Sequence, residues 1–158
     1  MRSQIVLTSL VVLSLAGRAS ADEADDAWKV LEKAEKFELY SIDPDLGDKV
    51  KDGFHGWKSL GQTTVKDTEL RKKLVTTLGD AIDNYLGGGK KCFDPRHAIR
   101  VKGDWNSYDF LICFECRYVY VYSGDKQIAV WKTSDEPKKL FNQTLKDAKV
   151  PLPKSPDK

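Results

Sequence analysis

The spacing of apolar residues predicts three helices. The clearest lies over residues 68–86, where an apolar residue occupies every fourth position and forms one face. These residues are Leu70, Leu74, Leu78, Ile82 and Leu86. Asp67 stands where an N-cap belongs. A first helix is expected from Asp22 and a last one around Phe141, because both regions carry apolar residues at helical spacing.

Period-two alternation predicts the strands, which occupy residues 37–42, 57–65, 98–101, 108–122 and 127–132. Gly124 and Asp125 fit a two-residue hairpin loop between the last two. The expected register places Ile99 opposite Phe110 and Tyr118 opposite Trp131. Short connections make neighbouring strands antiparallel, and the apolar helix stripes can cover one face. The sequence therefore predicts an α+β fold, with an antiparallel sheet of about five strands and the helices packed mainly on one face.

The first 21 residues have the composition of a secretory signal peptide. Arg2 gives a basic start, residues 5–15 are an apolar run, and Ala19-Ser20-Ala21 precedes Asp22. The run is shorter than the roughly 20 residues that a membrane span needs, and no later segment is longer. We expect cleavage after Ala21, a secreted or periplasmic location and no membrane span.

The charge balance argues against a nucleic-acid partner. The sequence holds 26 basic and 24 acidic side chains, and residues 1–21 contain two arginines and no acid. The chain after residue 21 is therefore neutral and has no bulk attraction for nucleic acid. Its length suits one domain, expected over residues 22–149. The proline- and lysine-containing tail, residues 150–158, is expected to be disordered.

Two of the three cysteines, Cys113 and Cys116, are spaced C-x-x-C within the expected strand over residues 108–122. Residues three apart in a strand point to opposite faces, with Cα atoms about 10 Å apart. A disulfide needs roughly 4.4–6.8 Å, so this pair is not expected to bond. The register instead brings Cys92 alongside them. Because cysteines of exported proteins tend to oxidise, we expect Cys92–Cys116 first, Cys92–Cys113 second and no disulfide third.

Polar residues near these cysteines make up a candidate functional cluster. Its members are Cys92, Asp94, Arg96, His97, Cys113, Glu115 and Cys116. Three thiols and the imidazole of His97 are a ligand set for zinc, or the basis of a thiol-redox site. The C-x4-H spacing matches no standard zinc finger. An enzyme would use His97 as general base, oriented by Glu115 or Asp94, with a cysteine as nucleophile. This reading is less favoured, because isolated histidines near strands are more often structural.

Tyrosines and valines alternate over residues 118–122, which predicts a strand with an aromatic and an aliphatic side. If the aliphatic side packs on the helices, the aromatic side is either a second buried layer or a platform for recognition. Cross-strand pairing that stabilises the hairpin is the favoured explanation.

The segments CFDPRHAIR and YDFLICFEC resemble a group of small exported bacterial proteins of unknown function, over roughly residues 90–122. The resemblance implies a bacterial periplasmic or secreted location and no activity. We therefore expect an exported, non-enzymatic domain that binds an unknown protein or small ligand, on its sheet or around residues 92–97. No cofactor is expected in this reading; zinc belongs to the alternative, a metal or thiol-redox site at Cys92, His97, Cys113 and Cys116.

Overall fold

The computed structural model describes residues 16–45, 50 and 53–154. Its helices are α1 (Ala16–Lys33), α2 (Thr68–Asp83) and α3 (Lys138–Asp147). Its strands are β1 (Phe37–Ile42), β2 (Ser59–Thr64), β3 (His97–Lys102), β4 (Ser107–Cys113), β5 (Tyr118–Ser123) and β6 (Lys126–Lys132). The strands form one antiparallel sheet in the order β2-β1-β3-β4-β5-β6. This confirms the α+β class and gives six strands where about five were expected.

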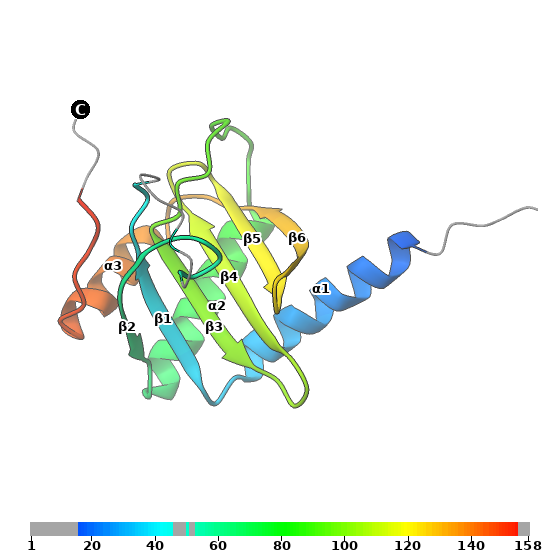
Figure 1. The fold of residues 1–158 in the computed structure, drawn as a ribbon, viewed down its shortest axis with the longest axis horizontal. Coiled ribbons are helices and arrows are strands. Elements are labelled where there is room, and N and C mark those ends of the chain that lie inside the picture. Colours follow the sequence, from blue (N-terminus) through cyan, green and yellow to red (C-terminus); the bar gives the residue numbers. More distant parts are fainter. Residues whose placement is uncertain (1–15, 46–49, 51–52, 155–158) are drawn as a thin grey trace, which may run out of the picture.

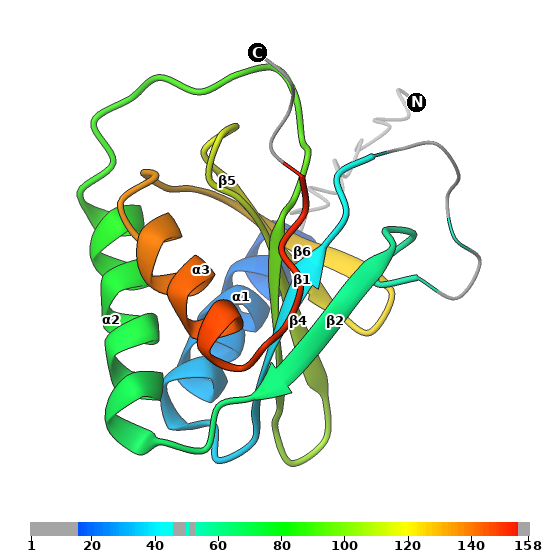
Figure 2. The same ribbon diagram turned by 90° about the vertical axis from the view of Figure 1, so that its left-hand side faces the viewer.

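All three helices lie on one side of the sheet (Figures 1 and 2). Alternation along the strands turns residues such as Phe110 and Val119 toward the helices, where they share one buried core with Leu78 of α2 and Phe141 of α3. The helices contribute one apolar stripe each, as the four-residue spacing in α2 predicts. The main core is therefore the layer between the helices and the sheet.

Helix α2 has the predicted start but a shorter end. The Asp67 carboxylate accepts a hydrogen bond from the backbone N–H of Leu70 at 2.9 Å, which confirms it as the N-cap. The helix stops at Asp83, and Leu86 is fully exposed. The three glycines that follow, Gly87–Gly89, all have positive φ and cannot continue a helix.

The prediction of one long strand over residues 108–122 is wrong, because this stretch forms a hairpin of two strands, β4 and β5. The N–H of Arg117 donates to the carbonyl oxygen of Cys113 at 2.7 Å and closes the turn. Arg117 adopts φ +64°, a conformation usually taken by glycine or asparagine. The turn contains neither glycine nor proline and therefore gave no sequence signal.

The expected register is confirmed between β3 and β4 and is displaced by one residue in part of the β5–β6 pair. Ile99 lies opposite Phe110, as predicted. Tyr118 lies opposite Lys132 rather than Trp131, because the β5–β6 pairing shifts by one residue between Val121 and Tyr122. Such a bulge inserts one unpaired residue into a strand, so counting outward from the turn fails beyond it.

The aromatic side of β5 belongs to a second, smaller core on the sheet face opposite the helices. This core contains Tyr40, Ile42, Phe54, Ala98 and Leu111, with Trp57, Phe93, Tyr120 and Tyr122 packed against it. The connection between β1 and β2 crosses this face (Figure 1) and brings Phe54 and Trp57 to it. Phe93 stacks on Tyr120 with ring centroids 3.7 Å apart. The tyrosines therefore form a partly covered layer rather than a bare platform.

The first helix, expected from Asp22, begins earlier, at Ala16. Residues 1–15 of the predicted signal peptide lie outside the described residues, and residues 16–21 form the first part of α1. Among the described helices, none has the length and apolarity to cross a bilayer.

The disorder expected over residues 150–158 does not hold for its first part. The side chain of Val150 is only 9 % exposed and packs beside Gly61 of β2. Arg96 Nη1 donates to the carbonyl oxygen of Lys154 at 2.7 Å. Apolar contacts and a hydrogen bond from buried Arg96 therefore hold residues 150–154 in place. Residues 155–158 lie outside the described part of the chain.

Candidate functional site

Cys92 and Cys116 form a disulfide, with their Cα atoms 5.8 Å apart. This confirms the preferred pairing. Cys113 is a free thiol among the described cysteines, and its side chain is buried. Its sulfur accepts the backbone N–H of Cys116 at 3.1 Å. The three cysteines therefore meet at one place, at the end of β4.

His97 does not join the sulfurs. Its side chain faces the helices, where Nε2 donates to Asn142 Oδ1 of α3 at 2.8 Å and the ring packs on Phe114 and Phe141. Cys113 follows Ile112 in β4, so alternation turns it toward the opposite face, together with Leu111. Burial lowers the pKa of His97 to about 4 and keeps the ring neutral.

The predicted zinc set is therefore not assembled from Cys92, His97, Cys113 and Cys116. Cys92, Asp94 and Cys116 do place ligand atoms within 4.8 Å of one another. Zinc binds thiolates, and the Cys92–Cys116 disulfide has none to offer. In this oxidised state, only the Asp94 carboxylate of that group could act as a ligand.

Arg96 and Glu115 belong to an ion cluster rather than to a catalytic arrangement with His97. Glu115 Oε1 accepts from Lys138 Nζ at 2.6 Å and lies 3.6 Å from Arg96 Nε. Burial would raise the pKa of Glu115, but the hydrogen bond and charge of Lys138, with the charge of Arg96, hold it below its usual value. The cluster joins α3 to the β4–β5 turn. His97 is oriented by Asn142 and not by Glu115 or Asp94, so the general-base reading of His97 is not supported.

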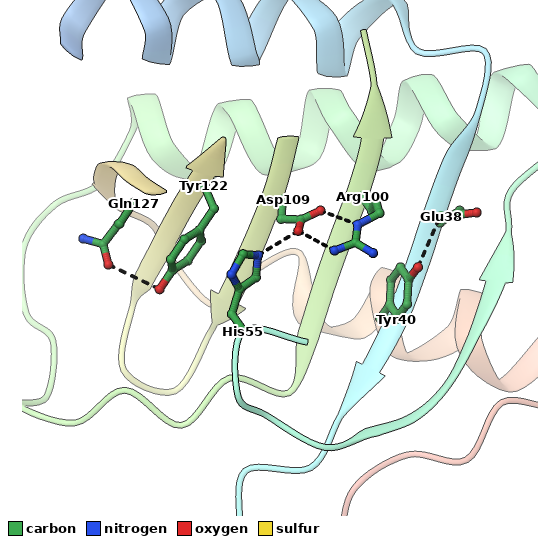
Figure 3. Close-up of polar contacts among 7 residues, drawn as sticks. All are labelled: Glu38, Tyr40, His55, Arg100, Asp109, Tyr122 and Gln127. Carbon is green, nitrogen blue, oxygen red and sulfur yellow. Dashed lines mark hydrogen bonds and ion pairs between the residues drawn. The ribbon is translucent and has the colours of Figure 1, made fainter. Parts of the chain in front are cut away.

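A polar group that sequence reasoning missed lies on the opposite face of the sheet (Figure 3). Asp109 is only 3 % exposed, and Arg100 Nε and Nη2 donate to its two carboxylate oxygens at 2.7 and 2.6 Å. His55 Nε2 donates to Oδ2 at 2.7 Å. Burial would raise the pKa of Asp109, but the hydrogen bonds from Arg100 and His55 bring it below its usual value.

The strand register and one strained turn position these three side chains. Arg100 and Asp109 are direct cross-strand partners in β3 and β4, so they share a face. His55 lies in the tight turn between Phe54 and Trp57 with φ +51°, and its ring stacks on Tyr122 at 3.9 Å. The pair could have been found from the Ile99–Phe110 register. The position of His55 could not, because no local pattern places this turn over the sheet.

A hollow of about 490 Å³ opens beside this group, lined by His55, Arg100, Ser107, Asp109 and Asp125 and by the backbones of three glycines. The glycines are Gly53, Gly56 and Gly124. Arg100 and Asp109 neutralise each other. Among the described residues, Arg100 Nη1 and His55 Nδ1 make no hydrogen bond. The hollow is therefore lined by the Arg100 and His55 side chains, both held by the buried Asp109 carboxylate, beside Ser107 and the Asp125 carboxylate.

Comparison of the chain with protein-family models, with curated proteins and with solved structures found no match.

Proposed function

We propose that this chain is an exported, non-enzymatic binding domain whose ligand occupies the hollow beside His55, Arg100 and Asp109. The ion pair between buried Asp109 and partly exposed Arg100 carries this proposal. Burying a carboxylate has a desolvation cost that its ion pair does little more than offset, so stability alone gives little reason for Asp109 beside an apolar core. Polar groups fixed by buried partners are what a ligand site needs for orientation and specificity.

The lining favours a small, neutral ligand rich in hydroxyl groups. The mutual neutralisation of Arg100 and Asp109 leaves no strong field for a charged ligand, and Asp125 is exposed and solvated. A hydroxyl group both donates and accepts hydrogen bonds, which suits a lining that contains a guanidinium, an imidazole and the Ser107 hydroxyl. The volume is within the range of small-molecule sites, roughly 300–1,000 Å³. We therefore propose a saccharide-like ligand.

The test is an NMR titration of the ¹⁵N-labelled domain with three neutral probes: maltotriose, cellotriose and chitotriose. We expect at least one to shift the amide signals of Gly53, Gly56 and Gly124, because these backbones line the hollow. Substituting His55→Gln should weaken that binding about tenfold, the effect of losing roughly one hydrogen bond to a fixed partner.

Asp125→Asn and Asp83→Asn provide a matched pair of controls, since each removes one exposed carboxylate. Asp125 lines the hollow, whereas Asp83 ends α2 on the other side of the sheet. Only Asp125→Asn should alter the changes that the bound probe causes in the amide signals. Absence of shifts with all three probes, or shifts confined to the helix side, would contradict the proposal.

Export is the second part of the proposal, and we expect cleavage after Ala21. The new N-terminus would place Asp22 and Glu23 in the first turn of the shortened α1, where acidic side chains favour a helix. The contact of Glu23 with Lys126 at 3.0 Å would remain. Expression of the full chain in a bacterium, followed by fractionation and intact-mass measurement, should give an extracytoplasmic protein that begins at Asp22. A cytoplasmic protein that retains residues 1–21 would contradict it.

Thiol chemistry is the alternative function. The meeting of Cys92, Cys113 and Cys116 at the end of β4 supports it. A metal site would require reduction of the disulfide, and His97 would not take part from its place against α3.

A further inference from the structure

We propose that Cys92, Cys113 and Cys116 form a thiol–disulfide exchange site, in which Cys116 pairs with Cys92 in one state and with Cys113 in the other. The site is separate from the hollow beside Asp109, so either proposal can fail without the other. The exchange would make Cys92 the reactive thiol of the second state, available to disulfides outside the protein.

The turn between β4 and β5 brings Cys113 and Cys116 close enough to bond. The Arg117 N–H donates to the Cys113 carbonyl oxygen, so the chain folds back within one turn. The N–H of Cys116 points at the Cys113 sulfur at 3.1 Å. The Arg117–Cys113 hydrogen bond closes a five-residue turn in which Cys113 and Cys116 are the first and fourth residues. First and fourth residues of a chain reversal have Cα atoms within about 7 Å, close to the roughly 4.4–6.8 Å of disulfides. The strand geometry that would separate these sulfurs is absent here.

The segment that carries Cys92 can move away from Cys116 once their disulfide breaks. Cys92 is partly exposed and lies in the connection between α2 and β3, residues 84–96, which is neither helix nor strand in the structure as described. Gly87, Gly88 and Gly89 give this connection wide backbone freedom. The segment can therefore adjust once the bond to Cys116 is broken.

The exchange balances without an external oxidant. The Cys113 thiol loses its proton to water, and the thiolate attacks the Cys116 sulfur. The Cys113–Cys116 bond forms as the Cys92–Cys116 bond breaks, and the Cys92 thiolate takes up a proton. Burial raises the pKa of Cys113, which keeps the thiol protonated in the present state, while the N–H groups of Asp94 and Cys116 stabilise the thiolate.

The first test is the variant Cys92→Ser, incubated with oxidised glutathione and assayed for free thiols after denaturation. We expect no free thiol, with peptide mapping showing a Cys113–Cys116 link. Two free thiols in a protein with native circular dichroism would overturn the proposal. In Cys116→Ser we expect Cys92 and Cys113 not to link to each other; a link between them would overturn the central role of Cys116.

The second test follows exchange in the unaltered protein. Iodoacetamide in native buffer should alkylate Cys92 as the second state forms, whereas buried Cys113 in the first state is protected. The same label at Cys92 should be absent in Cys113→Ser, which keeps the Cys92–Cys116 bond but has no attacking thiol. Labelling of Cys113 alone, or equal labelling of Cys92 in both proteins, would contradict the exchange.

Discussion

Replacing both Cys92 and Cys116 by alanine is expected to lower the free energy of unfolding by about 3 kcal/mol. The two residues are 24 positions apart, and a cross-link of that length restricts the unfolded chain by roughly this amount in the loop-entropy model. The double variant is needed because Cys92→Ser alone leaves Cys116 free to pair with Cys113. Urea unfolding followed by tryptophan fluorescence, without reducing agent, measures the difference.

The control for this variant is Cys113→Ala, which keeps the disulfide and removes one buried sulfur. Cys113→Ala should lower the free energy of unfolding by about 1 kcal/mol, the usual effect of removing a small buried group. Equal losses for the two variants would mean that packing, and not the cross-link, accounts for the stability at this end of the sheet.

Acidification from pH 6.5 to pH 4 should remove about 3 kcal/mol of stability because of His97 alone. In the unfolded chain an imidazole protonates near its ordinary pKa of 6.5, whereas burial lowers the pKa of His97 to about 4. Between these values the unfolded state binds more protons, so stability falls as the pH falls. Lowering the pKa of His97 from 6.5 to about 4 corresponds to about 3 kcal/mol. Above pH 6.5 this contribution is fully present.

The structure gives the reason for the low pKa of His97. Nε2 already donates its proton to Asn142, so a second proton would go to Nδ1, which is buried without a partner among the described residues. His97→Gln should therefore flatten the unfolding free energy between pH 6.5 and pH 4. His55→Gln changes the other histidine of the chain and should leave the pH dependence of the unfolding free energy due to His97 unchanged. A wild-type protein equally stable at pH 6.5 and pH 4 would contradict this account.

Local patterns predicted most of the fold. The four-residue spacing in α2 and the Asp67 cap gave that helix, and alternation gave β1 with its observed bounds, Phe37–Ile42. The β4–β5 turn escaped notice because Arg117 takes a positive φ without a glycine or proline nearby. The bulge beyond Tyr122 escaped notice because an extra residue in a strand changes no local composition.

The candidate site could be predicted only where it depends on register. The predicted pairing of Ile99 with Phe110 placed Cys92 beside Cys116, as observed. The prediction that a continuous strand separates Cys113 from Cys116 was wrong, because a turn joins them. His97 lies just before the strand predicted over residues 98–101 but begins β3 in the structure, and its partner Asn142 comes from α3. The contact of His55 with Asp109 spans 54 residues and depends on how one turn folds over the sheet.

The position of residues 150–154 has a consequence for the order of folding. Val150 covers Gly61 of the edge strand β2, and Lys154 supplies the acceptor for the buried Arg96. The domain therefore completes its native packing only after residues 150–154 have been synthesised and have docked against β2 and the connection before β3.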